Sequence, residues 1–244
     1  MSKYHLGSAS SLYRTIACPG WRFLEHAPDE PGEPAIRGTA IHDYLEKADQ
    51  PGQLDKVDSK YREFCKRINL KEISGMYVPQ EYREVKFAYD LETRTARVIP
   101  IEGHRNYGDK KWSEITGTAD VVNLGFKSGE AYDYKTGRYD RKRNPVATNP
   151  QLLFPALCIK KTIGPHIENF TIGIQQILKT KINTWVEGVD MLQLQVFEVK
   201  LQRVWQVAQK IVKKVEQGKK PEVVKGNHCF YCPAKPNCPA WRNR

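Results

Sequence analysis

The clearest pattern along the chain is a pair of β-type runs separated by a short, glycine-bounded connection. Residues 115–124 read Ile-Thr-Gly-Thr-Ala-Asp-Val-Val-Asn-Leu, and residues 131–138 read Ala-Tyr-Asp-Tyr-Lys-Thr-Gly-Arg. The connection, residues 125–129, begins and ends with glycine. Because β-branched and aromatic residues favour strands and glycine favours turns, the pattern predicts a β-hairpin.

The predicted hairpin carries acidic and basic side chains at positions that can converge. Residues i and i+2 of a strand point to the same face, so Asp133 and Lys135 should project together while Tyr132 and Tyr134 pack on the other side. Pairing of the two strands can bring Asp120 to the same end. We therefore expect two carboxylates and one ammonium group beside a largely apolar sheet.

Such a group of side chains has a chemical use in metal-dependent hydrolysis. Paired carboxylates can hold Mg²⁺ or Mn²⁺, which are hard cations that take oxygen ligands. A bound metal lowers the pKa of a water molecule and polarises a phosphate, and a neighbouring lysine can orient that water or stabilise negative charge. An Asp–Lys pair is also common on hairpins that bind no metal. The hairpin alone leaves both readings open.

Apolar spacing predicts an alternation of helices and strands along the rest of the chain. Pro28–Pro34 is rich in proline and glycine and should be a loop. We expect Thr39 to cap a helix that has His42 near the edge of its apolar stripe, and Asn149 to cap a buried helix with Gln151 in its first turn. Helices are predicted at residues 8–17, 37–48, 60–69, 149–160 and 189–216, and strands at 82–89, 95–101 and 170–178.

Length and charge narrow the class of protein. The chain has 244 residues, of which 40% are hydrophobic, a formal net charge of +11, no apolar run long enough to span a membrane and no apolar N-terminal leader. We expect a cytosolic protein with a polyanionic partner, most simply nucleic acid. The basic end of the last long helix is either a solvated face or a DNA contact. The candidate DNA contacts outside it are Arg37, Arg138, Arg141, Lys142 and Arg143.

The cysteines are clustered in a way that indicates metal ligation. Cys229, Cys232 and Cys238 form a C-x2-C-x5-C tail, whereas Cys65 should be a core thiol. The tail lacks a fourth ligand. His228 would complete a zinc site, and the distant Cys18 would complete a four-cysteine site suited to zinc or an iron–sulfur cluster.

Taken in order, these segments resemble the RecB-like exonucleases of the PD-(D/E)XK superfamily, in the iron–sulfur branch that includes CRISPR-adaptation and phage exonucleases. The resemblance runs from near the first residue to near the last. It is carried by Ser8-Ala-Ser-Ser-Leu, Cys18-Pro19, Arg37-Gly-Thr-Ala-Ile-His42, Glu84-Val-Lys-Phe, Gly117-Thr-Ala-Asp120, Asp133-Tyr-Lys135-Thr-Gly, Gln151-Leu and the cysteine tail.

The resemblance implies a role for each matching residue. The metal ligands would be His42, Asp120, Asp133 and the backbone carbonyl of Tyr134. Lys135 would be the catalytic lysine. Gln151 would position the lysine or the DNA, and Glu84 would be a secondary acidic residue of the site. A [4Fe-4S] cluster would join the two ends of the chain through Cys18, Cys229, Cys232 and Cys238, with Zn²⁺ as the alternative.

The resemblance also implies the fold and the reaction. The fold would be α/β, with a restriction-endonuclease-like core of a mixed central sheet flanked by helices. One nuclease domain would comprise an N-terminal segment (1–35), the core (36–186), a long helix (187–226) and the cysteine-rich tail (227–244). The expected enzyme is a metal-dependent deoxyribonuclease that acts on single-stranded DNA or DNA ends, with 5′-to-3′ polarity.

One departure from the family pattern and several rival functions stand beside the exonuclease interpretation. Pro155 stands where the family usually has a tyrosine, which puts strand selection in doubt. An endonuclease on the same fold and a non-catalytic, metal-stabilised nucleic-acid-binding protein are the rival functions, and a redox protein ranks last. Family members act in phage or host recombination, repair or replication, as monomers, homo-oligomers or subunits with partner proteins.

Overall fold

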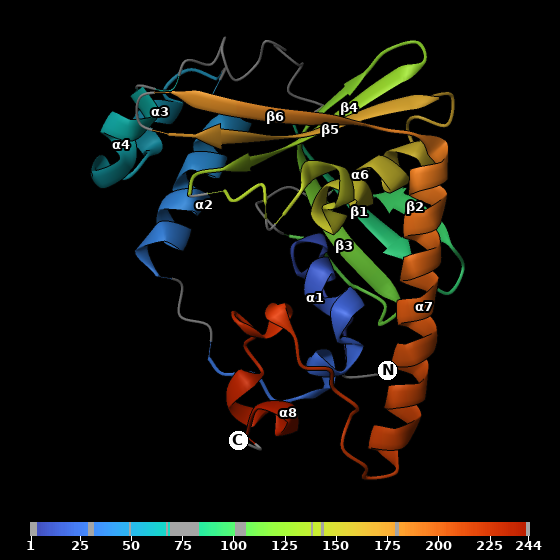
Figure 1. Cartoon of the computed structure of the whole chain (residues 1–244). Coiled ribbons are helices and arrows are strands. Elements are labelled where there is room, and N and C mark those ends of the chain that lie inside the picture. Colours follow the sequence, from blue (N-terminus) through green and yellow to red (C-terminus); the bar gives the residue numbers. More distant parts are fainter. Residues whose placement is uncertain are drawn as a thin grey trace.

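A six-stranded mixed sheet forms the centre of the protein (Figure 1). The computed structural model describes residues 4–28, 32–48, 50–66, 68, 83–100, 106–137, 139–142, 144–178 and 181–242. The strands lie in the order β2-β1-β3-β4-β5-β6. Their bounds are β1 Arg83–Asp90, β2 Thr95–Val98, β3 Glu114–Leu124, β4 Ser128–Lys135, β5 Asn169–Ile177 and β6 Ile182–Val189.

Strand directions follow from the connections between the strands. Adjacent strands that are joined by short turns pair antiparallel. Strands β1 and β3 also pair antiparallel. Only β4 and β5 pair in parallel within this sheet, and the chain between them includes helix α6 (Pro150–Lys161). Parallel neighbours need such a crossover because both strands begin at the same end of the sheet, so the chain must return to that end before the next strand starts.

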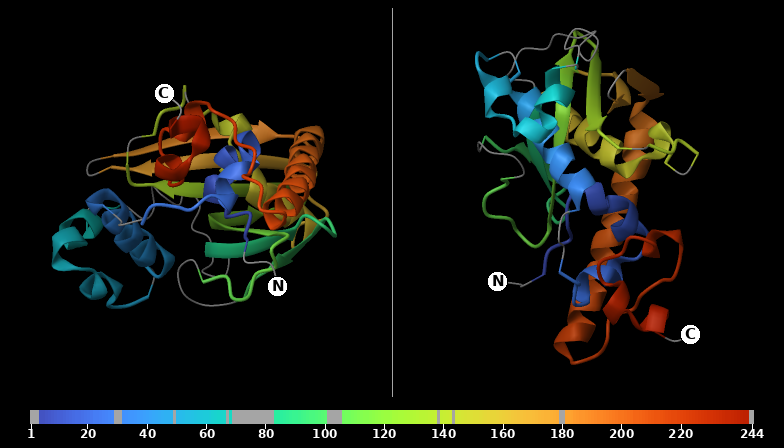
Figure 2. Two further views of the ribbon diagram at one scale, coloured as in Figure 1. Left: turned by 90° about the horizontal axis from the view of Figure 1, so that it is seen from below. Right: turned by 90° about the vertical axis from the view of Figure 1, so that its left-hand side faces the viewer.

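The larger hydrophobic core lies between the sheet and helices α6 and α7 (Met191–Glu216). Phe154 of α6 is fully buried, and Leu194, Phe197 and Leu201 of α7 pack in the same cluster. Figures 1 and 2 show α7 running along one side of the sheet and continuing past it. Asp190 caps α7 by accepting a hydrogen bond from the backbone N–H of Gln193.

A second, smaller core joins the other helices to the middle of the sheet. Helix α2 (Glu33–Glu46) and helix α4 (Ser59–Lys66) pack beside the short α3 (Gln53–Lys56). The members of this cluster are Ile41, Leu45, Val57, Tyr61, Cys65, Ile68, Val121, Tyr132, Tyr134 and Ile177. Because α2 is anchored here, its position relative to β3 and β4 is fixed by packing.

The two ends of the chain lie together. Helix α1 (Leu12–Ala17) sits beside the C-terminal segment, which ends in α8 (Pro239–Arg242) (Figures 1 and 2). Arg14 donates a hydrogen bond to the carbonyl of Tyr231 at 2.9 Å, and the N–H of Ala27 donates to the carbonyl of Pro233 at 2.9 Å. No helix of the described chain is both long and apolar enough to cross a membrane.

Most predicted elements are present close to their predicted bounds. The hairpin, the strands near residues 82–89, 95–101 and 170–178, and the buried helix after Asn149 are all confirmed. Cys65 is fully buried, as expected of a core thiol, and burial raises its pKa to about 11. Residues 67 and 69–82 lie outside the described residues, so the end of the predicted third helix and the start of the first strand are not compared.

Three expectations are wrong in their details. Helix α2 begins at Glu33 after Gly32, so Thr39 is not its cap. Pro34 lies in the first turn of α2, where a missing N–H costs nothing. Strand β6 has no counterpart among the predicted elements. The long helix begins after it, at Met191 instead of the predicted residue 189. The sequence also predicts Leu192, Leu194, Val196, Phe197, Val204, Val207 and Ile211 as the apolar positions of that helix, but Leu192, Val196 and Val207 are exposed.

Candidate active site

The β3–β4 hairpin places the central acid and lysine on one face, as predicted. Lys135 Nζ lies 2.7 Å from Asp133 Oδ2. Tyr132 and Tyr134 pack on the other side, in the cluster beneath α2 and α4. The strand period therefore sets the directions of these four side chains.

Two carboxylates face each other where β1 and β3 lose their regular geometry. Arg83 pairs with Val121 and Val85 pairs with Ala119, which places Glu84 opposite Asp120. Glu84 adopts a positive φ of 50°, a rare conformation for a residue with a side chain. Such strain persists where surrounding structure imposes it, often at functional sites. Direct opposition of two buried carboxylates is unfavourable unless a cation lies between or beside them.

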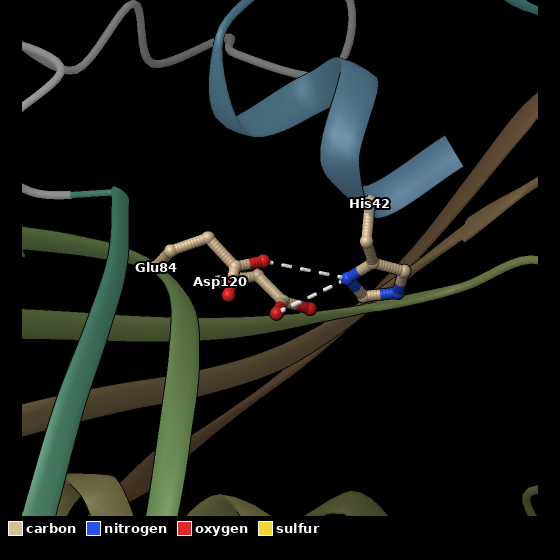
Figure 3. Close-up of side chains that lie close together, drawn as sticks. All are labelled: His42, Glu84 and Asp120. Carbon is tan, nitrogen blue, oxygen red and sulfur yellow. Dashed lines mark ion pairs between the residues drawn. The ribbon is translucent and has the colours of Figure 1, made fainter. Parts of the chain in front are cut away.

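Helix α2 supplies a third group to this pair of carboxylates. His42 Nδ1 lies 3.4 Å from Asp120 Oδ1 and 3.6 Å from Glu84 Oε1 (Figure 3). One ligand atom from each of the three residues falls within 4.8 Å of the others. The ring of His42 also meets the ring of Tyr134 edge-on, with 5.9 Å between centroids. The packing of α2 on β4 thus aims the imidazole at the two acids.

The mutual charges of these groups perturb their protonation. Burial raises the pKa of Glu84 to about 7, and the nearby Asp120 adds to the rise. Burial opposes charge on His42, but Asp120 and Glu84 outweigh it and hold the pKa of the imidazole well above its usual value. Burial also opposes charge on Asp120, yet His42 and the N–H of Tyr134 keep its pKa below the usual range. Without a metal, the imidazolium is the cation that offsets the acids.

A second set of contacts fixes Asp133 and Lys135. Gln151 Nε2 donates to Asp133 Oδ1 at 2.6 Å, and Lys135 Nζ donates to Gln151 Oε1 at 3.2 Å. Gln151 lies in the first turn of α6, where its backbone N–H is capped by Asn149 Oδ1 at 3.0 Å. Burial raises the pKa of Asp133 although Lys135 opposes the rise. The first turn of α6 therefore fixes the positions of Asp133 and Lys135 relative to each other through Gln151.

The amino-acid sequence matches a known protein family over nearly its whole length. The sequence profile of the PD-(D/E)XK nuclease superfamily matches residues 7–239. The chain belongs to this superfamily. No sequence among the curated proteins is significantly similar to it.

Two solved structures are also similar to this PD-(D/E)XK nuclease. One is a protein from Eubacterium rectale described as a candidate exonuclease, at 12% identity and a TM-score of 0.49, over 94% of this chain and 87% of that chain. The other is the protein SSO0001, at 16% identity and a TM-score of 0.34, over 87% of this chain and 89% of that chain. The superfamily assignment rests on the sequence match.

PD-(D/E)XK nucleases use divalent metals, and the side chains here suit such an ion. Carboxylate oxygens are the ligands that Mg²⁺ and Mn²⁺ prefer, and an imidazole is acceptable to Mn²⁺. His42, Glu84 and Asp120 could bind one ion together. The family resemblance implied only a secondary role for Glu84. Its place in the cluster depends on the irregular pairing with β3, for which the sequence carries no local signal.

The other predicted ligands and DNA contacts occupy less defined positions. Asp133 interacts electrostatically with both Asp120 and His42 but is not one of the three clustered residues, so its role as a metal ligand stays a prediction. Arg37 donates to the carbonyl of Thr136 at 3.4 Å, beside the end of β4. Arg141 and Lys142 are exposed, whereas Arg138 and Arg143 lie outside the described residues. The metal-ligand role of the Tyr134 carbonyl stays a prediction.

Pro155, the departure from the family pattern, is buried in α6. Position 155 therefore faces the core, and a side chain there would not reach a DNA strand without a change in the helix. Proline has no N–H, so the carbonyl of Gln151 lacks its usual intrahelical donor four residues on. The start of α6 consequently carries one more carbonyl with no helical partner than an uninterrupted helix would.

Cys18, in the N-terminal segment, lies close enough to the cysteines of the C-terminal tail to interact with them electrostatically. The charges of Cys229 and Cys238 both raise the pKa of Cys18, although burial is the larger cause. The N–H of Val224 donates to Cys18 Sγ at 3.2 Å. Among the described residues, no three thiols have their sulfur atoms within 4.8 Å of one another. The predicted grouping of these four residues around one metal centre, and their ligand role, stay predictions.

Proposed function

We propose that this chain is a metal-dependent DNA exonuclease that hydrolyses phosphodiester bonds in single-stranded DNA or at DNA ends. The observation that carries the proposal is the cluster of His42, Glu84 and Asp120, which lies beside the paired Asp133 and Lys135. These residues stand in a chain of the PD-(D/E)XK nuclease superfamily. A structural ion pair would not require a histidine and two opposed acids at a strained strand position.

In this proposal each residue of the site has a separate role in hydrolysis of the phosphodiester bond. A bound Mg²⁺ or Mn²⁺ would polarise the phosphate and lower the pKa of a water molecule. Lys135 presents its ammonium group beside the acids, where it can orient the nucleophile and stabilise charge that develops on the phosphate oxygens. Gln151 and Asp133 hold that ammonium group in position. Because these contacts are already formed, little reorganisation is needed during the reaction.

The finer features of the activity rest on the family resemblance. It favours 5′-to-3′ polarity and a role in phage or host DNA recombination, repair or replication. The formal net charge of +11 supports a polyanionic substrate such as DNA. Arg37, Arg141 and Lys142 are candidates for guiding DNA to the site.

A second metal centre is part of the proposal. Cys18, Cys229, Cys232 and Cys238 would bind a [4Fe-4S] cluster that joins the two ends of the chain. Four thiolates can also hold Zn²⁺, so a zinc site is the alternative to the cluster. Iron, sulfide and zinc analysis of anaerobically purified protein tests this, and a colourless zinc protein would contradict the cluster.

The nuclease is tested with DNA labelled at its 5′ or 3′ end, with Mg²⁺, Mn²⁺ or EDTA. We expect metal-dependent degradation by the native protein and its loss in Asp120→Asn and Lys135→Ala. Matched controls are Asp109→Asn and Lys200→Ala, because both residues are exposed and lie outside the site. Labelled mononucleotides released first from the 5′ end would support the polarity.

The outcomes separate the rival functions. Circular single strands that are cut as quickly as linear ones would indicate an endonuclease. DNA binding without cleavage, in a folded and metal-loaded protein, would favour the non-catalytic binding protein. Cleavage that survives both site variants would show that the active site lies elsewhere or that a contaminant is responsible.

A further inference from the structure

The C-terminal segment exposes two aromatic rings that the nuclease site does not use. Phe230 is 69% exposed and Tyr231 is 78% exposed. Their rings meet nearly perpendicularly, with 4.7 Å between centroids. Single exposed apolar residues are ordinary, but a contiguous exposed pair of large rings is typical of a binding surface.

A buried arginine joins this pair to a third aromatic residue. Arg14 Nη2 donates to the hydroxyl of Tyr13 at 3.0 Å and to the carbonyl of Tyr231 at 2.9 Å. Tyr13 is itself 40% exposed, and the guanidinium group of Arg14 lies 5.3 Å from the centre of its ring. Arg14 also stacks on Trp21, whose side chain is buried. Arg14 therefore ties the backbone at Tyr231 to the side chain of Tyr13, which brings the segment that carries Phe230 and Tyr231 next to Tyr13.

The surroundings of these rings are strongly basic. Residues 209–244 contain nine lysines and arginines but only two acidic residues, and there is no acidic residue in 223–242. One of the two, Glu222, is paired with Lys214. The ammonium group of Lys235 lies 5.9 Å from the ring centre of Phe230 and 4.2 Å from that of Trp241. The ammonium group of Lys225 likewise lies 5.6 Å from the ring centre of Trp241, so two lysines stand among the aromatic residues of this segment.

We infer that Tyr13, Phe230 and Tyr231, with Lys225 and Lys235, form a platform on which unpaired bases of a single DNA strand stack. Aromatic rings accept any base because every base has a π face, and the lysines attract the backbone phosphates. A protein partner with an apolar surface would suit the rings but not the surrounding charge. The inference rests on the proposed function for the identity of the nucleic acid, and it adds a second strand contact away from the metal cluster.

The test measures binding rather than cleavage. Fluorescence anisotropy of a labelled oligothymidylate is followed with EDTA in place of Mg²⁺, for the native protein and for the double variant Phe230→Ala/Tyr231→Ala. Because stacked aromatic residues contribute strongly to single-strand affinity, we expect the Kd to rise by about tenfold or more. A fluorescent base analogue in the strand should show quenching with the native protein that the double variant loses.

Two control variants keep the test specific. Phe126→Ala removes a ring that is 88% exposed at the β3–β4 turn, and it should leave the Kd unchanged. The exchange Phe230→Tyr/Tyr231→Phe retains both rings and should retain native affinity. Thermal unfolding and metal content of each variant, measured in parallel, would reveal damage to the neighbouring cysteines.

Each contrary result overturns the inference in a different way. An unchanged Kd in the folded double variant would show that the rings do not bind the strand. An equal loss for a blunt duplex, whose bases are paired, would replace stacking by a general electrostatic contact. Conversion of a native oligomer to monomers by the double variant would make the rings a protein interface. The binding assay uses no metal and no turnover, so a native protein that binds but never cleaves refutes the proposed function alone.

Discussion

Gln151 provides the sharpest test of how the site is organised. Its side chain donates to Asp133 Oδ1 at 2.6 Å and accepts from Lys135 Nζ at 3.2 Å. Both partners are ionisable, and hydrogen bonds to charged groups contribute about 1.5–3 kcal/mol each. If Gln151→Ala removes one such contribution from the transition state, the rate should fall by roughly 10- to 150-fold.

The assay for this prediction separates rate from binding. Single-turnover cleavage with saturating enzyme and Mn²⁺ gives the rate of the bond-breaking step, and anisotropy with EDTA gives the DNA affinity. We expect Gln151→Ala to lower the rate while the Kd for DNA stays within about twofold, because Gln151 acts through Lys135 and Asp133. Gln206→Ala, at an exposed position of α7, is the matched control and should cleave at the native rate.

A second substitution shows which hydrogen bond matters. Gln151→Glu keeps an acceptor for Lys135 but replaces the donor to Asp133 by a carboxylate. Repulsion between the two acids should raise the pKa of Asp133, so this variant should lose activity at acid pH before the native protein does. A native rate in both Gln151→Ala and Gln151→Glu would refute the view that α6 positions the lysine.

Three further predictions concern capping, metal binding and the core. Asn149→Ala removes the cap of α6, so urea denaturation should show a free energy of unfolding that is lower by about 1 kcal/mol. Cleavage should also slow, because Gln151 lies in the first turn of this helix. An unchanged free energy of unfolding would contradict the capping role. Burial raises the pKa of Glu84 to about 7 in the metal-free protein, so Glu84 holds a proton at lower pH that a metal must displace. Calorimetric titration should therefore show Mn²⁺ affinity falling between pH 7 and pH 6 by about fivefold more in the native protein than in Glu84→Gln. An equal fall in both would exclude Glu84 from the metal site. Tyr89 donates to Glu198 at 2.5 Å in the core, and Tyr89→Phe should cost about 1.5–3 kcal/mol in the free energy of unfolding. An unchanged urea midpoint would show that Lys161 and Arg94, 3.0 Å and 3.5 Å from Glu198, satisfy the carboxylate without Tyr89.

Local patterns were sufficient to predict the parts of the site that lie on one element. Asp133 and Lys135 share a strand face because of the two-residue period, and Gln151 lies in a helix that begins with an asparagine cap and a proline. Their approach to one another was implied only by the family resemblance, because residues 136–149 separate β4 from α6. These features depend on short-range geometry that the residues themselves specify.

Features that depend on distant parts of the chain could not be predicted in the same way. Glu84 lies beside His42 and Asp120 because β1 passes β3 opposite Asp120, and nothing in the sequence near Glu84 indicates its positive φ. Strand β6 is an edge strand whose residues are mostly not buried, so it lacks a clear apolar alternation. Pro34 resembles a helix breaker until the helix is seen to start one residue before it.

The measurement that tests the central claim most directly is the location of bound Mn²⁺ by anomalous X-ray diffraction from crystals of the native protein. We expect a peak within bonding distance, about 2.0–2.4 Å, of Asp120 and of His42 or Glu84. The peak should be absent from crystals of Asp120→Asn grown under the same conditions. A native protein that binds Mn²⁺ elsewhere, with His42 and Asp120 still in their direct contact, would contradict the assignment of this cluster as the catalytic metal site.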